Sequence, residues 1–321
     1  MEANVRAHTN IALIKYWGKD NQTLKTPLMS SLSMTLDAFY TDTKVIHDPS
    51  LTKNRFYLND VEQDAEHSKR VFNYISRLQE MFKVNDHFEI HSYNHVPTAA
   101  GLASSASAFA ALAGAFAKSY NLDLAMPQLS RLARLGSGSA TRSVYGGFVK
   151  WIKGDDITSI AIPINEHPDW DLHMLAVEIN TGEKKISSSK GMLHAQTSPF
   201  YQPWLDRNDL EINELEVAIK NKDFSKLGEL AELSANEMHS TNLTATPSFT
   251  YFEPATIKLI HLVHNLRKQG IECYYTIDAG PNVKILTQEK NINSISSAVH
   301  NLLGNVKIVD ASFGPGLTYL D

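Results

Sequence analysis

The residues best suited to chemistry begin with PTAAGLASSASAFAAL, residues 97–112, where small side chains lead from a predicted strand into an alanine-rich helix. Small residues let backbone N–H groups approach phosphate oxygens closely, and the start of a helix favours an anion. Ser104 and Ser105 add hydroxyls for phosphate or metal. Close helix packing is the structural alternative, but it does not call for serines at the helix start. We therefore predict a phosphate-binding loop, although it lacks the GxxxxGK[ST], GxGxxG and GxSxG patterns of other enzyme classes.

A second cluster, RLGSGSATRS at residues 134–143, combines small residues with strong donors. Its two glycines free the backbone, while Ser137, Ser139 and Arg142 supply hydroxyls and a planar guanidinium fork that suits carboxylate or phosphate. The structural alternative is a flexible connection with a surface arginine. We favour anion binding because the other clusters accompany it.

The third cluster, AHTNIALIKYWGKD at residues 7–20, gathers two lysines, a tyrosine and an amide: Asn10, Lys15, Tyr16 and Lys19. Together these side chains can hold a polyanion. Taken alone, the segment is more typical of an amphipathic strand with Trp17 as a core anchor and lysines in solvent. A functional interpretation therefore depends on what lies opposite this segment.

Asp278 is the candidate catalytic acid–base group, in YYTIDAGPNVKIL at residues 274–286. The pattern predicts a strand, a tight turn and a second strand, with Asp278 at the entrance to the turn. An aspartate in a turn usually caps its own backbone. A catalytic role requires Asp278 to lie close to the cationic clusters, where it can orient or deprotonate a hydroxyl.

Composition narrows the classes of function. The formal net charge of −5, spread over mixed signs, gives no basic footprint for nucleic acid or an anionic membrane. No stretch resembles a signal peptide or a membrane span, so we expect a cytoplasmic protein. The single cysteine, Cys273, sits in an apolar stretch and is predicted to be a buried bystander. No HExxH or paired Cys/His spacing appears, and we interpret four histidines as core or solvated residues: His8, His239, His261 and His264.

Hydrophobic periodicity predicts a mixed α/β first half and an α+β second half. In the first half we expect strands at 31–46, 87–93, 143–152, 159–164 and 172–180, with helices at 64–82, 102–120 and 127–135. A domain boundary is expected near Thr181. Beyond it we expect helices at 198–220, 224–239, 254–269 and 295–303, with strands at 272–278, 283–287 and 306–310.

Taken in chain order, the three clusters and the Asp278 segment resemble the GHMP kinase superfamily and, within it, the mevalonate diphosphate decarboxylases. The carrying segments are NIALIKYWGK, AAGLASSAS, GSGSATRSVYGGF and DAGPN, which run from residue 10 to residue 282. The resemblance implies an α+β, two-domain GHMP kinase fold. Residues 1–181 would form an N-terminal α/β, ATP-binding domain with a left-handed βαβ crossover, against the usual hand. Residues 182–321 would form a ferredoxin-like α+β C-terminal domain.

The resemblance also implies an activity. ATP and Mg²⁺ phosphorylate the tertiary hydroxyl of mevalonate diphosphate, and loss of phosphate and carbon dioxide leaves isopentenyl diphosphate. Asp278, Lys15 and Arg142 correspond to catalytic positions, with Asn10 supporting the arginine that holds the substrate carboxylate. The positions for the substrate diphosphate are Tyr16, Lys19, Ser137, Ser139, Ser188 and Lys190. The ATP phosphate loop comprises Gly101, Leu102, Ala103, Ser104 and Ser105. A homodimer is also implied.

One position departs from the family pattern. Some bacterial relatives carry an arginine where this chain has Ser189, and Lys190 is the candidate replacement, as a point charge in place of a fork. Three other functions remain open: a decarboxylase of mevalonate 5-phosphate, a small-molecule kinase without decarboxylation, and a non-catalytic nucleotide-binding sensor. Relatives that stop at phosphorylation are expected to change Lys15 and Asp278, and both are present here.

Overall fold

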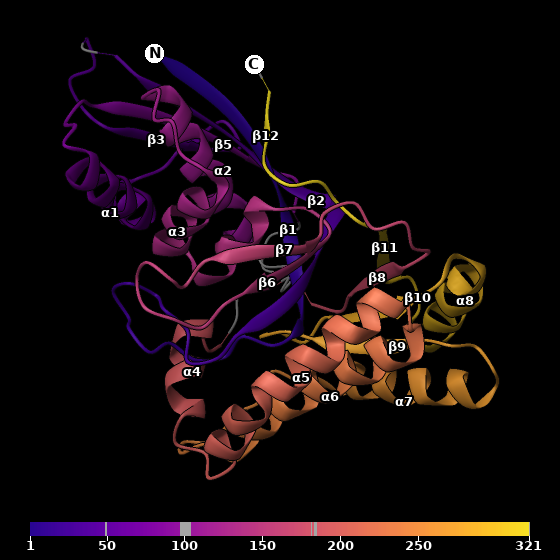
Figure 1. Ribbon diagram of the computed structural model, residues 1–321. Helices are drawn as coiled ribbons and strands as arrows, with labels where there is room; N and C mark the ends of the chain where they lie inside the picture. The colour runs from indigo at the N-terminus through magenta and orange to yellow at the C-terminus, as the bar shows by residue number, and fades with distance from the viewer. Residues whose placement is uncertain (49, 97–103, 181, 183–184, 321) are drawn as a thin grey trace.

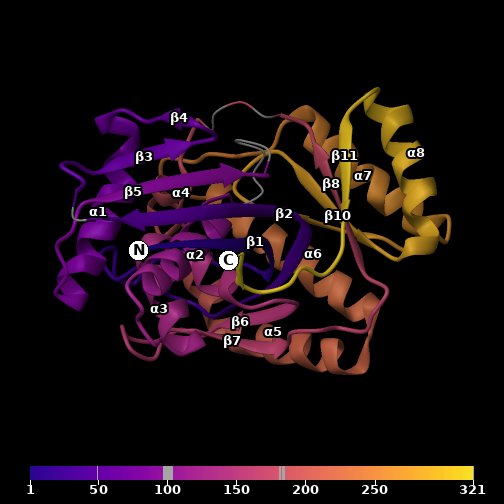
Figure 2. The ribbon, with the colours of Figure 1, turned by 90° about the horizontal axis from the view of Figure 1, so that it is seen from above.

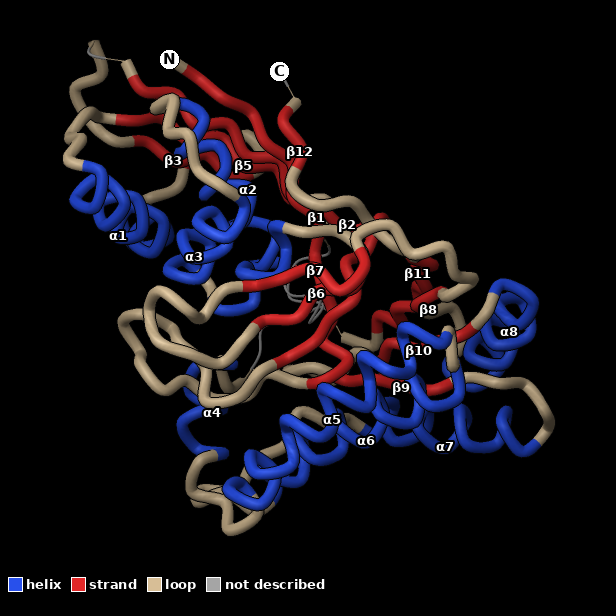
Figure 3. The backbone as a smooth tube through the Cα atoms, in the orientation of Figure 1, coloured by secondary structure: helices blue, strands red, loops and turns tan. Residues whose placement is uncertain are grey.

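The computed structural model describes residues 1–320 except 49, 97–103, 181, 183 and 184. The described residues form two sheets with helices packed against them (Figures 1 and 3). The larger sheet runs in the order β12-β1-β2-β5-β3-β4, and β6 pairs with β2 and with β7. Its strands are β1 (Glu2–Ile14), β2 (Ser31–His47), β3 (Arg55–Leu58), β4 (Val61–Glu62), β5 (Phe88–Asn94), β6 (Phe148–Trp151), β7 (Ala161–Asn165) and β12 (Thr318–Tyr319).

β1 and β2 form the centre of this sheet. From Asp37 onward, β2 alternates between buried and more exposed residues, as the predicted strand at 31–46 requires. β1 is buried along its second half, and its pairing with β2 shifts register between His8 and Asn10 and again between Ala12 and Ile14. Such irregularities redirect side chains, and here they lie directly before the polar residues of the third cluster.

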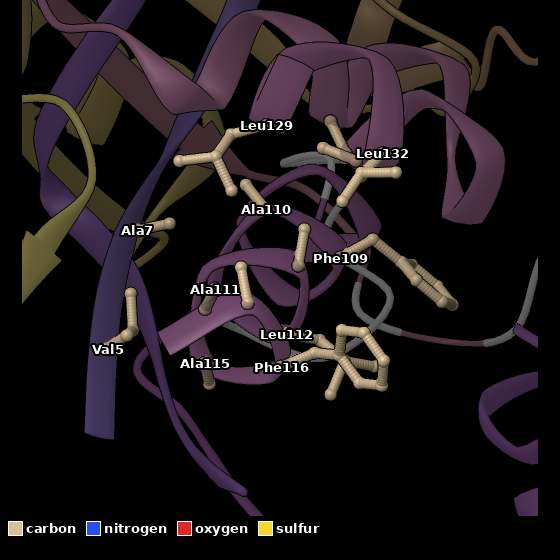
Figure 4. Close-up of a cluster of buried hydrophobic side chains, with 14 of the residues drawn as sticks. Val5, Ala7, Phe109, Ala110, Ala111, Leu112, Ala115, Phe116, Leu129 and Leu132 are labelled. Carbon is tan, nitrogen blue, oxygen red and sulfur yellow. The ribbon is translucent and has the colours of Figure 1, made fainter. Parts of the chain in front are cut away.

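The helices α1 (Ala65–Phe82), α2 (Ser104–Ser119) and α3 (Met126–Gly136) pack beside the larger sheet. α1 begins at Asp64, whose side chain accepts the backbone N–H of His67, and it connects β4 to β5, which runs parallel to β3. α2 is rich in alanine, and its small side chains bring it close to Val5 and Ala7 of β1 (Figure 4). The predicted helices at 64–82, 102–120 and 127–135 are thus confirmed over their described residues.

The strand expected at 143–152 is largely wrong. A 3₁₀ helix, η1, covers Gly138–Val144, and a strand begins only at Phe148. The Thr141 hydroxyl donates to the Gly138 carbonyl at 2.7 Å, a local bond that favours a tight turn over a strand. Gly147 then adopts a φ of +63°, so the chain turns before β6 can pair.

The second sheet has the order β11-β8-β10-β9, and each neighbouring pair is antiparallel. Its strands are β8 (His173–Glu178), β9 (Tyr274–Ile277), β10 (Val283–Thr287) and β11 (Lys307–Ala311). Helices separate β8 from β9 and β10 from β11, which gives the βαββαβ arrangement of a ferredoxin-like domain. The fold is therefore the α+β, GHMP kinase-like fold that the resemblance implies.

β8 corrects one prediction. The sequence grouped the strand at 172–180 with the first half, whereas β8 pairs with β10 and β11 of the second sheet. Periodicity identifies a strand but carries no information about its partners, which tertiary packing selects. The boundary expected near Thr181 lies outside the described residues and stays a prediction.

The helices of the second half are α4 (Ser188–Ala195), α5 (Tyr201–Asn221), α6 (Phe224–Leu243), α7 (Pro254–Lys268) and α8 (Ile292–Leu303). α6 packs against both β1 and β9, and it therefore touches both sheets (Figures 1 and 2). Residues of β1, such as Ile11 and Leu13, share one apolar core with Leu227 and Leu230 of α6. The two sheets are thus held against a common helix.

Candidate active site

The centre of the site is an ion pair that joins the two sheets. Lys15 follows the last residue of β1, and Asp278 follows the last residue of β9. The Lys15 Nζ lies 2.7 Å from Asp278 Oδ1 and also donates to the Ala12 carbonyl at 2.8 Å. On the other side, the Nζ of Lys284 in β10 lies 3.2 Å from Asp278 Oδ2. The proximity that a catalytic Asp278 requires is therefore present.

These charges fix the protonation state of Asp278. Burial alone works to raise the pKa of its carboxyl, but Lys15 and Lys284 outweigh burial and hold the pKa well below its ordinary value. Burial lowers the pKa of Lys15 to about 8, against the attraction of Asp278. Asp278 is consequently an anion at neutral pH, whereas Lys15 titrates only slightly above neutrality.

Arg142 lies in η1 with its side chain buried. Its Nε donates to Asn10 Oδ1 at 3.0 Å, and its Nη1 donates to Ser31 Oγ at 2.6 Å. Asn10 is held in turn, because its Nδ2 donates to Ser143 Oγ at 2.7 Å. Burial lowers the pKa of Arg142 to about 10, and the charge of Asp278 opposes that effect. The guanidinium is thus a fixed cation within the electrostatic reach of Asp278.

Tyr16 brings a polar atom into the same region. Its hydroxyl is buried and has no hydrogen-bond partner among the described residues. Buried hydroxyls are normally paired, so this atom is suited to receive a ligand. Its ring lies edge-on to Trp151, and a Cβ at Gly138 would come within 2.8 Å of the Tyr16 hydroxyl. A glycine at position 138 therefore makes room for Tyr16.

Three serines link the start of α2 to the second cluster. Ser105 Oγ lies 3.1 Å from Ser137 Oγ, which lies 3.4 Å from Ser139 Oγ. Ser104 and Ser105 form the first turn of α2, where free backbone N–H groups favour anions. The other predicted loop residues, Gly101, Leu102 and Ala103, lie outside the described residues.

The segment that carries Ser188, Ser189 and Lys190 contacts the third cluster through Lys19. Lys19 Nζ donates to Ser189 Oγ at 3.1 Å, while Ser188 is half-buried and Lys190 is exposed. Gly191 lets α4 pack on Trp17 and Tyr251, because a Cβ there would lie 2.6 Å from the Tyr251 hydroxyl. The structure thus brings Ser189, rather than Lys190, into contact with Lys19.

A cavity of about 540 Å³ opens beside this site, against α1 and the end of α3. Lys25, Arg70 and Arg77 line it and donate to backbone carbonyls, and within the described chain none of the three forms an ion pair. Burial, followed by the charge of Arg70, lowers the pKa of Lys25 to about 7. Glu66 also lines the cavity, but the basic residues outnumber it, and an excess of cations suits a polyanion.

Sequence reasoning gave no functional role to Lys25 and the cavity residues of α1, or to Ser31 and Lys284, and it quoted Ser143 only as part of the second cluster. The sequence did contain a pattern that could have identified part of the cavity. Polar residues recur at positions 66, 69, 70, 73 and 77, which is the i, i+3, i+4, i+7 spacing of one helix face. Lys284 lay within a quoted motif. Its contact with Asp278 depends on the pairing of β9 with β10.

No group of three or more His, Cys, Asp or Glu side chains is placed to hold a metal ion among the described residues. Mg²⁺ is usually bound through nucleotide phosphates and waters with few protein ligands. The donor set found here, with the Ser104 and Ser105 hydroxyls at a helix start, fits Mg²⁺ that arrives with ATP phosphates. In addition, no described helix is long and apolar enough to cross a membrane.

Comparisons with known proteins agree with this geometry over nearly the whole chain. A diphosphomevalonate decarboxylase-like N-terminal domain matches residues 7–161, and a mevalonate 5-diphosphate decarboxylase C-terminal domain matches residues 174–315. The human diphosphomevalonate decarboxylase is 34% identical over 91% of this chain and 78% of its own length. The Ganoderma lucidum enzyme of the same name is 35% identical over 92% of this chain and 80% of its own length.

Solved structures give the same result. Mevalonate diphosphate decarboxylase from Staphylococcus aureus superimposes with a TM-score of 0.96 at 45% identity, covering 100% of this chain and 98% of that one. A structure described as "MDDEF in complex with MVAPP, AMPPCP and Magnesium" superimposes with a TM-score of 0.94 at 45% identity, covering 100% and 99%. The chain therefore belongs to the diphosphomevalonate decarboxylase family.

Proposed function

We propose that Asp278, Lys15 and Arg142 carry the chemistry of an ATP- and Mg²⁺-dependent decarboxylase. This enzyme converts (R)-5-diphosphomevalonate to isopentenyl diphosphate, ADP, phosphate and carbon dioxide, in the mevalonate pathway of isoprenoid biosynthesis. The observation that carries the assignment is the 2.7 Å Lys15–Asp278 pair, formed between two sheets next to the buried Arg142. The carboxylate leaves as neutral carbon dioxide, so a cation can serve to orient it, while an anion can stabilise the carbon that loses its oxygen.

Arg142 is the proposed cation. Its guanidinium is fixed by Asn10 and Ser31, so it can hold the substrate carboxylate in one orientation without reorganising. A defined carboxylate orientation aligns the C–C bond with the C–O bond that breaks, and the C–C electron pair then forms the new double bond. Asn10 has the supporting role in this arrangement.

Asp278 is the proposed anion. Its lowered pKa makes it a weak proton acceptor in the resting enzyme, so we assign it the tasks of orienting the tertiary hydroxyl and stabilising positive charge on the tertiary carbon. Lys15 holds this carboxylate in place. Transfer of the γ-phosphoryl group from ATP forms an O–P bond at the tertiary hydroxyl, breaks the bond to the ADP oxygen, and releases the hydroxyl proton to solvent. The phosphate ester is a better leaving group than the hydroxyl, and the departing phosphate takes the C–O electron pair.

The remaining predicted residues are proposed to bind phosphate. Tyr16 has an unpartnered buried hydroxyl, and Lys19 reaches the segment that carries Ser188, Ser189 and Lys190. Ser137 and Ser139 lie between this group and Ser105 at the start of α2, so diphosphate and ATP phosphates can meet there. The cationic cavity beside Gly136 is proposed as a further place for ATP, in addition to the predicted phosphate loop of Gly101, Leu102, Ala103, Ser104 and Ser105.

A homodimer in the cytoplasm is also proposed. The family resemblance supports the dimer, and the buried, unpaired Cys273 is compatible with a reducing compartment. Light scattering of the purified protein at several concentrations measures the assembly directly. A mass of one chain at all concentrations would reject the dimer.

The test of the function follows ADP and carbon dioxide together, with ATP, Mg²⁺ and either mevalonate diphosphate or mevalonate 5-phosphate. We expect equal release of ADP and carbon dioxide with the diphosphate and little with the monophosphate. Release of ADP without carbon dioxide would indicate a kinase. Equal release with the monophosphate alone would change the substrate but keep the reaction class.

A further inference from the structure

One helix contacts Lys15 and the residue that precedes Asp278. On α6, Ser234 accepts the backbone N–H of Lys15 at 3.0 Å, and His239 Nε2 lies 3.2 Å from the carbonyl of Ile277, the residue before Asp278. Asn242, one turn later, accepts the indole N–H of Trp17 at 2.8 Å. The ends of β1 and β9 come from different sheets, so α6 is an element through which their separation can be set.

The geometry of His239 assigns its tautomer. A carbonyl oxygen only accepts, so the 3.2 Å contact requires the proton on Nε2. The Nδ1 atom is buried and has no hydrogen-bond partner among the described residues. Phe252 lies beside the ring, with centroids 4.4 Å apart, and Tyr251 lies edge-on to it. The imidazole is therefore held in one orientation by aromatic packing, with a single donor aimed at Ile277.

Burial keeps the ring of His239 neutral, and two neighbouring lysines contribute. Burial lowers the pKa of His239 to about 3, and the positive charges of Lys15 and Lys284 act in the same direction, while Asp278 opposes them. A protonated ring would add a third cation beside Asp278. The neutral ring instead gives a hydrogen bond to the strand that carries Asp278, without competing with Lys15 for its charge.

We propose that His239 is a positioning residue for the decarboxylation. Its Nε2–H bond to Ile277 fixes the end of β9 and so places the Asp278 carboxylate against Lys15. Among the described residues, His239 makes no hydrogen bond to a residue that we propose to bind substrate. It acts through Asp278. This inference rests on the proposed role of Asp278.

The test compares His239→Leu, which has no donor, with His239→Gln, whose side-chain amide can donate in place of Nε2. Because small displacements of reacting groups are costly in rate, we expect His239→Leu to lower kcat by roughly 10- to 100-fold. The KM for mevalonate diphosphate should change by less than about 2-fold, since no substrate contact is lost. His239→Gln should recover most of kcat.

The pH profile separates positioning from mere stability. A looser Lys15–Asp278 pair raises the pKa of Asp278, so the acidic limb of kcat should move to higher pH in His239→Leu and return in His239→Gln. His264→Leu is the matched control, because His264 is partly exposed on α7 and bonds to Glu232. Equal pH profiles for wild type and His239→Leu, or no recovery with His239→Gln, would overturn the inference.

A double-mutant cycle keeps this inference distinct from the proposed role of Asp278. If His239 acts through Asp278, His239→Leu should cause little further loss of kcat in an Asp278→Asn background. A full additional loss in that background would reject positioning through Asp278. An Asp278→Asn enzyme with wild-type kcat would instead reject the role of Asp278 itself, whatever His239→Leu does alone.

Discussion

Two carboxyl groups, Asp278 and Glu211, leave water on folding and respond in opposite ways. Asp278 keeps a side-chain exposure of 22% and meets two lysines, which hold its pKa below the ordinary value against the effect of burial. Glu211 of α5 is 3% exposed and faces Glu237 of α6. Burial, reinforced by Glu237, raises the pKa of Glu211. Neighbouring charge decides the outcome once solvent is removed.

The hydrogen bonds of the two groups show the same contrast. Neither oxygen of Glu211 has a hydrogen-bond partner among the described residues, and Arg207 approaches only to 3.5 Å. Two carboxylates only accept hydrogen bonds, whereas a proton on Glu211 makes it a donor to Glu237. Asp278, by contrast, accepts a hydrogen bond from the Lys15 ammonium at Oδ1, over a distance of 2.7 Å. One buried site is therefore built to keep a negative charge, and the other to avoid it.

The largest expected effect comes from removing the charge at the first of these sites. Asp278→Asn should lower kcat by roughly 10³-fold, the loss typical of a group that stabilises transition-state charge in a protected site. Glu211→Gln is the matched control and should keep kcat within about 2-fold, because it lies outside the proposed chemistry. Steady-state release of ADP and carbon dioxide measures both. Comparable losses of kcat in Asp278→Asn and Glu211→Gln would show that Asp278 has no special role in the reaction.

The second prediction concerns the cation of the ion pair. As pH rises through about 8, Lys15 loses its proton and Asp278 loses its partner, so kcat should fall on an alkaline limb near pH 8. Arginine stays charged to much higher pH, so Lys15→Arg should move this limb upward by more than about one pH unit. The control is Lys150→Arg, which changes a lysine paired with Glu216 away from the site. An unmoved alkaline limb would show that Lys15 does not control it.

The third prediction tests whether both lysines hold Asp278. Lys284→Met removes one neighbouring cation but leaves Lys15, so the pKa of Asp278 should rise toward its ordinary value of 3.8. The acidic limb of kcat should then move upward by about one pH unit. We expect kcat at neutral pH to fall by about 10-fold, less than in Asp278→Asn. A kcat–pH profile identical to that of the wild type would assign the low pKa to Lys15 alone.

The sequence predicted the candidate site better than it predicted how the site is assembled. Asn10, Lys15, Arg142 and Asp278 were identified from residue types and from the family resemblance. The structure pairs Asn10 with Arg142 and Lys15 with Asp278. Residue types name possible chemistry, but a contact such as Lys284 with Asp278 depends on which strands pair. The cationic cavity was missed for a similar reason, because it needs α1 and the end of α3 to face one another.

The fold shows the same limit. Long elements with strong periodicity, such as α6 and β2, were predicted close to their observed bounds. Two short elements, β3 and α4, were not predicted, because four and eight residues are too few to establish a period. The strand predicted at 143–152 begins late because a 3₁₀ helix, which a local side-chain hydrogen bond favours, occupies residues 138–144. The placement of β8 in the second sheet required long-range pairing, which no local pattern reports.

The smallest expected effect concerns stability and comes from the second carboxyl. The folded protein raises the pKa of Glu211 from 4.5 to about 8, so the stability contributed by the protonated form is present below pH 4.5 and is lost as pH rises through about 8. Glutamine keeps a donor toward Glu237 without a charge. Glu211→Gln should therefore raise the free energy of unfolding by roughly 1–3 kcal/mol at pH 8, and by little at pH 4.5. Urea unfolding at several pH values measures the difference. A gain that does not change with pH would mean that the two carboxyls share no proton, and the contrast with Asp278 would then reduce to a difference in packing.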